Sequence, residues 1–535
     1  MSAGIISRND VCRVERGYGR MKAKNIMVQG TGSSVGKSII TAGLCRVLMQ
    51  DGHRSAPFKS QNMALNSFIT KEGKEMGRAQ VVQAEAAGLE PSVEMNPILL
   101  KPTTDIKSQV ILNGEVYKNM SAAEYHNFKP ELAVLVRNAY EKLAEKHEII
   151  VIEGAGSPAE INLRDKDIVN MGMAEIVDAP VILVGDIDKG GVFASLAGTM
   201  LLLTEAERKR VKGVIINKFR GDIGILKPGL EMLEEIIHIP VLGVLPYAKL
   251  YIEEEDGLSE RFCQESEDRE YDIDVAVVKL PHISNFTDIN ALENIPGVRV
   301  RFIERVSEIQ KPDLIVIPGT KNTMGDLTHI RGNAMEAAIK RLHEKGTPVF
   351  GICGGYQMLG MEINDPFRTE SDLLQMEGMG LLNTRTVFQQ QKITTQVEGA
   401  ISGDDGMLKG LKGMKIKGYE IHMGTTDCSE GCNPFLIIHK GLDEGLKVTG
   451  GVVNEAGNVF GTYIHGIFDN MSFASGLINN LRERKGASRI QEYEKEFRAF
   501  KEQQYDKLAD MIREDLDMDR IYEIIGVRGE KQPCR

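Results

Sequence analysis

The chain has 535 residues, more than one hydrophobic core usually serves, so we expect two folding units of comparable size. Hydrophobic residues make up 42% and charged residues 26%, a composition that excludes a largely disordered or collagen-like chain. The 65 Lys and Arg against 76 Asp and Glu give a formal net charge of -11, which disfavours binding to nucleic acid or to anionic membrane surfaces.

Cysteine usage and the first residues bear on the compartment. The seven cysteines are scattered and odd in number, so they do not form a disulfide framework and they fit a reducing environment. Residues 1–20 mix several charges with no apolar stretch long enough for a signal peptide, and we treat them as an N-terminal extension. No apolar run approaches the length of a bilayer crossing. The sequence therefore predicts a cytoplasmic protein without a membrane partner.

Short apolar runs alternate with helical patterns over residues 21–248. The runs are NIMVQG, EIIVIEG, APVILVGDID, VKGVIINKF and IPVLGVLPY. Such unbroken β-branched runs are typical of buried parallel strands, and their alternation with helices indicates right-handed βαβ units. The pattern predicts a doubly wound α/β domain that binds a nucleotide.

A glycine-rich phosphate loop, GTGSSVGKS, follows the first predicted strand and precedes a helical pattern. In such a loop the backbone N–H groups and the helix N-terminus bind phosphates, Lys37 reaches the terminal phosphates and Ser38 can ligate Mg²⁺. The spacing departs from the usual one, because five residues separate Gly30 from Gly36. The predicted triphosphate-binding residues are Gly30, Thr31, Gly32, Ser33, Ser34, Val35, Gly36, Lys37 and Ser38.

Carboxylates end two further strand patterns of this domain. Glu153 closes EIIVIEG, and Asp186 and Asp188 lie in GDIDKGG. In open α/β sheets, ligands such as metal ions and phosphates bind at the carboxyl ends of the strands. Each carboxylate could ligate Mg²⁺ or cap a helix, and we favour the metal role for Glu153. The candidate magnesium ligands are Ser38, Glu153 and Asp186.

The chain changes character beyond the first domain. Residues 249–271 are acidic and poor in apolar residues, which predicts a surface linker. A second alternation of strands and helices over residues 272–475 predicts a second doubly wound α/β domain. Residues 476–535 carry apolar side chains at helical spacing, and we expect helices that pack on the second domain because the heptads are too few for a coiled coil.

A cysteine on a tight turn is the chemical feature of the second domain. PVFGIC followed by GGYQMLG predicts a buried strand, a sharp turn and a helix, with Cys353 at the turn. The flanking glycines allow a strained backbone that exposes a nucleophile, and the helix N-terminus favours the thiolate. His465, just past a late strand pattern, is the candidate base. The pair suits attack on an amide or acyl carbon.

GxCxGxQ with a late strand-ending histidine resembles the class I, or triad-type, glutamine amidotransferase domain. The resemblance implies that Cys353 attacks the carboxamide of glutamine, forms a glutamyl thioester and releases ammonia. Ile467 stands where the family usually has a glutamate, which leaves open what orients His465, and Thr320 and Lys321 replace part of the usual glycine-rich string. The residues expected at the oxyanion hole and around glutamine are Gly319, Gly354, Gly355, Gln357, Glu420 and His422.

The longer phosphate loop resembles that of dethiobiotin synthetase and its relatives, which phosphorylate carboxylates. The resemblance implies ATP as the nucleotide and Asn217 as the residue that recognises the base. It also implies Lys59 beside the substrate carboxylate, although from its position alone Lys59 could equally be a solvated lysine.

The two domains together, with FKSQNMALNS, LLKPT, GDIDKGGVFAS and KGYEIHMG, resemble the glutamine-dependent amidases of the cobalamin pathway. The resemblance implies a glutamine-hydrolysing carbon–nitrogen ligase. Its acceptor would be adenosylcobyrinic acid a,c-diamide, whose b, d, e and g carboxylates are amidated with ATP and glutamine. It also implies that Lys59 and Lys101 bind this acceptor. The alternatives are the branch that makes the a,c-diamide, another amidating ligase, or a phosphate-loop ATPase switch with a silent glutaminase.

Overall fold

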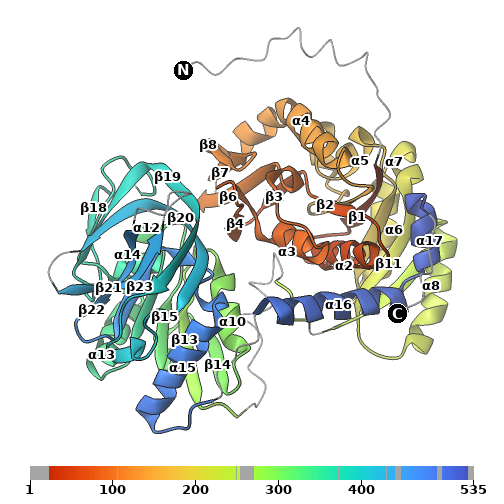
Figure 1. Cartoon of the computed structure of the whole chain (residues 1–535). Coiled ribbons are helices and arrows are strands. Elements are labelled where there is room, and N and C mark those ends of the chain that lie inside the picture. Colours follow the sequence, from red (N-terminus) through yellow and green to blue (C-terminus); the bar gives the residue numbers. More distant parts are fainter. Residues whose placement is uncertain are drawn as a thin grey trace.

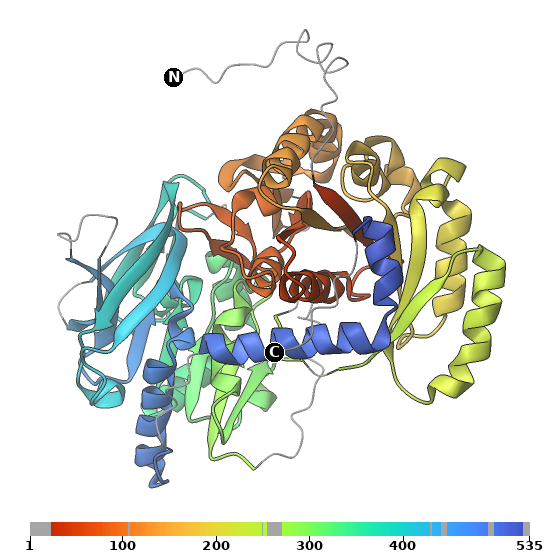
Figure 2. The same ribbon diagram turned by 45° about the vertical axis from the view of Figure 1, so that its right-hand side comes forward.

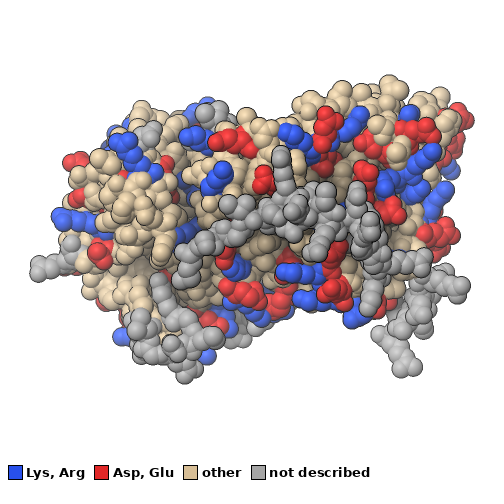
Figure 3. All heavy atoms as spheres, turned by 90° about the horizontal axis from the view of Figure 1, so that it is seen from above, with Lys and Arg blue, Asp and Glu red and all other residues tan. Residues whose placement is uncertain are grey.

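The structure is a computed structural model that describes residues 23–104, 107–248, 250–253, 270–371, 373–428, 431–439, 447–490 and 497–527. The expected extension at residues 1–20 and most of the expected linker at residues 249–271 lie outside these ranges. Figures 1 and 2 show two α/β bodies side by side, one from each half of the chain. Basic and acidic side chains are interspersed over the described part of the face in Figure 3, so this face carries no single acidic patch.

Within the described ranges, the centre of the N-terminal domain is a six-stranded parallel sheet in the order β12-β11-β10-β1-β9-β2. Its strands are β1 (Lys24–Gly30), β2 (Ser55–Phe58), β9 (Ile149–Glu153), β10 (Val181–Asp186), β11 (Val211–Phe219) and β12 (Val241–Pro246). Their β-branched residues are buried because helices cover both faces of the sheet. The phosphate loop follows the central β1, so it lies over the carboxyl edge of the sheet.

The helices of this domain are α2 (Lys37–Gln50), α3 (Arg78–Ala86), α4 (Ala122–Ala144), α5 (Met171–Ile176), α6 (Val192–Leu202), α7 (Glu205–Arg210) and α8 (Ile223–Ile237), with short 3-10 turns η1 (Val93–Met95) and η2 (Ile161–Lys166). One apolar cluster joins the sheet to α4, α5 and α6, and another joins it to α2. The domain therefore has a core on each face of its sheet, as a doubly wound fold requires.

A second layer of strands projects from this domain toward the C-terminal one (Figure 1). It comprises a four-stranded sheet, β3-β6-β7-β8, and a hairpin, β4-β5. The bounds are β3 (Gln61–Met63), β4 (Ser67–Ile69), β5 (Glu75–Gly77), β6 (Ile98–Thr104), β7 (Lys107–Leu112) and β8 (Glu115–Ser121). Strand β4 contacts β19 and β20 of the C-terminal domain, so this layer forms part of the domain interface.

The C-terminal domain is built on a sheet that is twelve-stranded among the described residues and partly parallel. Its parallel part has the order β14-β13-β15-β16-β23. These strands are β13 (Ile273–Val278), β14 (Val298–Ile303), β15 (Leu314–Ile317), β16 (Val349–Ile352) and β23 (Val459–Thr462). Most of the remaining pairs are antiparallel: β17 (Glu362–Asn364), β18 (Gln375–Glu377), β19 (Thr384–Ile401), β20 (Lys415–Cys428), β21 (Cys432–His439), β22 (Lys447–Asn454) and β24 (Ile464–His465). The expected doubly wound pattern thus describes only the parallel part.

The helices of the C-terminal domain pack around one large core. They are α10 (Asn290–Glu293), α11 (Val306–Ile309), α12 (Thr323–Gly332), α13 (Met335–Glu344), α14 (Gly354–Leu359) and α15 (Met471–Lys485), with η3 (Phe286–Ile289), η4 (Gly406–Leu408) and η5 (Ile467–Asp469). Helix α15 belongs to this core, so the boundary expected at residue 475 falls inside a helix.

The last two helices, α16 (Phe497–Asp515) and α17 (Met518–Ile525), pack on the N-terminal domain. The expectation that they pack on the second domain is wrong. Ile512 lies where a Cβ on Gly43 of α2 would come within 2.7 Å of its Cγ1, so the bare glycine allows the close approach. Arg46 of α2 adds ion pairs of 2.7 Å to Glu502 and to Asp506. Helical spacing predicts the apolar stripe but not the surface that it covers.

None of the helices in the described ranges is both long and apolar enough to cross a bilayer.

Candidate active sites

The phosphate loop has the backbone that its sequence predicts. Gly36 has φ +99°, and a Cβ added there would lie 2.0 Å from Asn217 Nδ2, so only glycine fits. Asn217 donates a hydrogen bond of 2.9 Å from Nδ2 to the carbonyl oxygen of Val35. The structure thus places the predicted base-recognition residue against the loop, and recognition of the base stays a prediction.

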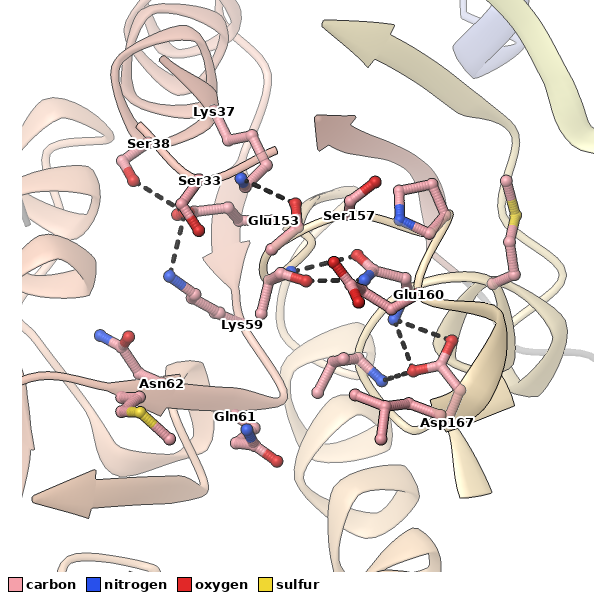
Figure 4. A pocket seen from close by; sticks show the side chains of 18 of the residues that line it. Ser33, Lys37, Ser38, Lys59, Gln61, Asn62, Glu153, Ser157, Glu160 and Asp167 are labelled. Atoms are coloured by element: carbon pink, nitrogen blue, oxygen red, sulfur yellow. Dashed lines mark hydrogen bonds and ion pairs between the residues drawn. The ribbon is translucent and has the colours of Figure 1, made fainter. Parts of the chain in front are cut away.

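Four side chains meet beside this loop, and Figure 4 shows three of them, Ser38, Lys59 and Glu153. Ser38 Oγ donates a hydrogen bond of 2.7 Å to Glu153 Oε1, and Lys59 Nζ lies 3.0 Å from the same oxygen. Gln83 Nε2 donates to the other carboxylate oxygen at 2.5 Å. Burial raises the pKa of Glu153, but Lys59, the hydrogen bonds from Gln83 and Ser38, and Lys37 together hold it below its usual range. The carboxylate is therefore ionised.

The donor set fits a magnesium ion only in part. A hydroxyl and an ionised carboxylate in direct contact, Ser38 and Glu153, are hard oxygen ligands of the kind that Mg²⁺ takes. The structure does not bring Asp186 to them. Asp186 Oδ2 instead lies 3.3 Å from Lys218 Nζ, and Oδ1 accepts from the backbone N–H of Asp188 at 2.9 Å. Of the three predicted ligands, Ser38 and Glu153 are in contact and Asp186 pairs elsewhere, and magnesium binding stays a prediction.

A cavity of about 400 Å³ extends from the phosphate loop to the segment around η2. Lys37, Ser38, Lys59 and Glu153 line it at the loop, and Figure 4 shows Ser157, Glu160 and Asp167 beside them. Lys129 of α4 and Arg164 of η2 add positive charge to the wall. No local motif marks Lys129, Arg164 or Asp167 in the sequence, because only the tertiary fold brings α4 and η2 to the loop.

Cys353 lies between β16 and α14 in a conformation that is unusual for a residue with a side chain, φ 51° and ψ -109°. Such strain persists only where the surroundings hold it, and it is concentrated at functional sites. Here the backbone N–H of Cys353 donates to the carbonyl of Thr462 at 2.8 Å, and a Cβ on Gly355 would lie 2.0 Å from the carbonyl oxygen of Ile317. The strained turn that the glycine pattern predicts is present.

Asp288 orients His465. Its Oδ2 lies 2.7 Å from His465 Nδ1, and its Oδ1 accepts from the backbone N–H of Gly466 at 2.8 Å. Burial lowers the pKa of His465, but Asp288 and a hydrogen bond to Cys353 outweigh burial and raise this pKa to about 10. Sequence reasoning missed Asp288, which precedes His465 by 177 positions and has no motif of its own.

A second, small cavity gathers the two predicted catalytic residues and two of the residues expected around glutamine. Cys353, Gln357, His422 and His465 all line it. His422 stacks on Tyr463 at 3.7 Å between ring centroids, and Glu420 Oε2 lies 3.9 Å from His422 Nε2. An added Cβ on Gly319 would lie 3.3 Å from His465 Cε1, so Gly319 is close to the catalytic histidine. An added Cβ on Gly354, which follows Cys353, would lie 2.6 Å from Thr320 Cγ2.

Lys101 also lines this second cavity, not the first. Its Nζ lies 2.9 Å from Glu75 Oε1 and 2.9 Å from Ser67 Oγ, at the domain interface. The two lysines predicted to bind the acceptor, Lys59 and Lys101, thus line different cavities, and acceptor binding by either stays a prediction. The cavities differ because β6 carries Lys101 into the layer of strands that contacts the C-terminal domain.

A phosphate-loop nucleotide domain and a Cys–His–Asp site on one chain define a glutamine amidotransferase ligase. Comparisons with known proteins agree. Residues 26–258 match the model of the CobQ/CobB/MinD/ParA nucleotide binding domain, and residues 274–473 match the CobB/CobQ-like glutamine amidotransferase domain.

Relatives cover nearly the whole chain. It is 56% identical over 504 residues to the cobyric acid synthase of Thermoanaerobacter sp. (strain X514), a match over 94% of this chain and 99% of that protein. It is 56% identical over 501 residues to the cobyric acid synthase of Alkaliphilus metalliredigens, over 93% and 99% of the two chains. The solved structure of PurLQS from Thermotoga maritima, at 21% identity and a TM-score of 0.31 over 40% of this chain and 99% of that one, is too distant to carry an argument. The chain belongs to the cobyric acid synthase family.

Proposed function

We propose that the protein amidates the b, d, e and g carboxylates of adenosylcobyrinic acid a,c-diamide, with ATP as the activating nucleotide and glutamine as the source of ammonia. Membership of the cobyric acid synthase family supports the acceptor. The observation that carries the chemistry is the pairing, on one chain, of the Cys353–His465–Asp288 site with the Ser38–Glu153–Lys59 site.

Ammonia is released at the cysteine site. The Cys353 thiolate attacks the carboxamide carbon of glutamine, and backbone N–H groups near Gly319 and Gly354 stabilise the oxyanion. His465 gives its proton to the departing nitrogen, which leaves as ammonia, and a glutamyl thioester remains. Water, deprotonated by His465, then attacks the thioester carbon and releases glutamate and the free thiolate. Asp288 holds the imidazole in the orientation that both proton transfers need.

The acceptor is activated at the phosphate loop. A carboxylate resists ammonia because it is negatively charged and has no leaving group. An oxygen of the carboxylate attacks the γ-phosphorus of ATP, ADP leaves, and an acyl phosphate forms. Ammonia then attacks the acyl carbon, phosphate leaves with the C–O bond electrons, and loss of a proton gives the amide. Lys37 and Lys59 offset the negative charge that this step brings together.

Magnesium would be held by Ser38 and Glu153 together with the triphosphate, and it supplies charge neutralisation on the phosphate oxygens. Lys129 and Arg164 on the far wall of the cavity supply positive charge for an acceptor that carries several carboxylates. Hydrolysis of glutamine on the same chain keeps ammonia local and unprotonated.

The test uses the purified protein with ATP, glutamine and each corrinoid acceptor in turn, and the mass of the product is measured after stepwise addition of ATP. Four successive amidations of adenosylcobyrinic acid a,c-diamide are expected. Amidation of cobyrinic acid at only the a and c positions would replace this proposal with the sister reaction. If neither the wild type nor Cys353→Ala released glutamate, the glutaminase site would be silent.

A further inference from the structure

The cavity at Cys353 is lined by both domains. Lys101 of the N-terminal domain faces it together with Lys321, Glu370 and Lys392 of the C-terminal domain. None of these four side chains takes part in the attack on the carboxamide, in the transfer of the proton or in the oxyanion hole. The cavity therefore holds a cluster of charges that the proposed chemistry does not use.

Two of the lysines share one buried carboxylate. Glu75, which is 1% exposed, lies 2.9 Å from Lys101 Nζ and 2.6 Å from Lys392 Nζ. Burial raises the pKa of Glu75, but the two lysines outweigh it and hold that pKa far below its usual range. Glu75 is thus charged, and it fixes both ammonium groups at the wall of the cavity.

Lys321 and Glu370 are less tightly held: within the described part of the chain neither makes an ion pair, although each favours the charged form of the other. Among the residues that the structure describes, the Lys321 ammonium makes no hydrogen bond or ion pair. Burial lowers the pKa of Lys321, and so does the charge of Lys101. Burial raises the pKa of Glu370, whose carboxylate accepts from the backbone N–H of Thr323 at 3.2 Å. The neutral form of both side chains is therefore favoured relative to water. An anionic group bound beside Lys321 and a cationic group bound beside Glu370 would restore the charged forms.

Glutamine carries that pair of charges. Beyond its carboxamide, which reaches Cys353, it has one carboxylate and one ammonium group on the same carbon. Among the described residues, three lysines, Lys101, Lys321 and Lys392, line the cavity with one carboxylate, Glu370, so basic groups outnumber acidic ones along its wall and favour an anionic group. We propose that Lys321 and Lys101 bind the α-carboxylate of glutamine and that Glu370 binds its α-ammonium group. This inference rests on the proposed glutaminase.

The site proposed for glutamine draws side chains from both domains. Lys101 belongs to β6 of the N-terminal domain, and Ser67 of β4 holds the same ammonium group at 2.9 Å. Ser67 also accepts, through its carbonyl oxygen, a hydrogen bond of 2.9 Å from Asn285, which precedes the turn that carries Asp288. The glutamine site is therefore complete only when the N-terminal domain is docked on the C-terminal one.

The test measures glutamate or product release by the full chain with three amides. They are glutamine, 4-aminobutanamide, which lacks the α-carboxylate, and glutaramic acid, which lacks the α-amino group. Lys321→Met and Lys101→Met are expected to raise KM for glutamine by about 10- to 100-fold, the range for a lost hydrogen bond to a charged group, and to leave 4-aminobutanamide unchanged. Glu370→Gln is likewise expected to raise KM for glutamine and to leave KM for glutaramic acid unchanged. Lys340→Met, a half-buried lysine on α13 that pairs with Glu336 and lies outside the cavity, is the matched control.

Two results would overturn the inference. One is an equal loss for glutamine and for the truncated amide, which would mean that the side chain positions the catalytic residues. The other is an unchanged KM for glutamine in Lys321→Met. Lys101 is buried, so Lys101→Met can destabilise the fold and lower the thermal unfolding midpoint. Lys321 is only half-buried, so the result for Lys321→Met decides the test in that case. Ammonia-driven amidation is measured in parallel. Its absence in the wild type would contradict the proposed function but would not contradict the proposed glutamine site.

Discussion

Asp288 contacts both the side chain of His465 and the backbone next to it. Its Oδ2 lies 2.7 Å from the imidazole Nδ1, and its Oδ1 accepts a hydrogen bond of 2.8 Å from the backbone N–H of the following residue, Gly466. The carboxylate therefore fixes the ring and its tautomer, so that Nδ1 carries the proton and Nε2 is directed to Cys353. A carboxylate from η3, at the other end of the domain in sequence, completes the site in place of the glutamate that usually follows the histidine.

Replacing Asp288 tests this relationship. Asp288→Asn should lower kcat for glutamine hydrolysis by about 100-fold or more, because the amide neither selects the tautomer nor stabilises the imidazolium. Amidation driven by added ammonia should stay within about 2-fold of the wild type. Steady-state assays with each nitrogen source check both values, with the exposed Asp405→Asn as the control. Equal rates of glutamine hydrolysis in Asp288→Asn and the wild type would remove Asp288 from the site.

The pH dependence should change in the same variant. Because the folded pKa of His465 is raised from 6.5 to about 10, the protonated form contributes stability that is fully present below about pH 6.5 and is lost as the pH rises through about 10. Without Asp288, burial dominates and the pKa falls. The excess free energy of unfolding of the wild type over Asp288→Asn should therefore shrink as the pH rises from 6.5 to 10. Denaturant unfolding at several pH values measures it, and a difference that grows with pH would refute the assignment.

Glu153 should matter for the nucleotide and not for glutamine. Glu153→Gln removes the ionised oxygen that accepts from Ser38 and pairs with Lys59, so amidation should fall and the Mg²⁺ concentration for half-maximal rate should rise by at least about 10-fold. Glutamine hydrolysis should be retained. A magnesium titration of ammonia-driven amidation provides the readout, with the exposed Glu141→Gln on α4 as the control. An unchanged magnesium requirement would count against the proposed ligand pair.

A comparison of alanine substitutions at Gly36 and at Gly52 distinguishes steric clash from backbone strain. Gly36→Ala combines a left-handed φ of +99° with a Cβ 2.0 Å from Asn217 Nδ2, so ATP affinity should drop by at least about 10-fold. Gly52→Ala has a similar φ of +86° with nothing within 4 Å, so it should cost only about 1 kcal/mol of stability and leave ATP affinity unchanged. Nucleotide titration and thermal unfolding compare the two variants. Tight ATP binding by Gly36→Ala would mean that the loop does not hold the phosphates.

The parts of this molecule that sequence predicts are those whose chemistry is local. Gly30–Ser38 and the turn at Cys353 each lie within a few residues of chain, so the glycines, the nucleophile and the following helix can be recognised together. Asp288 and Lys101 are different, because each reaches its site through strand pairing or domain docking that no local pattern encodes. For the same reason the apolar spacing in α16 predicts a helix but not its partner, which depends on the bare Gly43 of α2. Asp186 pairs with Lys218 and not with Ser38 or Glu153, because strand ends that share an edge of a sheet need not share a site.

The central claim is that nitrogen released at Cys353 is consumed at the phosphate loop. The most direct measurement compares product formation by Cys353→Ala and by Lys37→Ala with glutamine and with added ammonia. We expect Cys353→Ala to lose glutamine-driven amidation by at least about 1,000-fold and to keep the ammonia-driven reaction, and Lys37→Ala to lose both. Loss of the ammonia-driven reaction in Cys353→Ala, or its survival in Lys37→Ala, would contradict this division of labour.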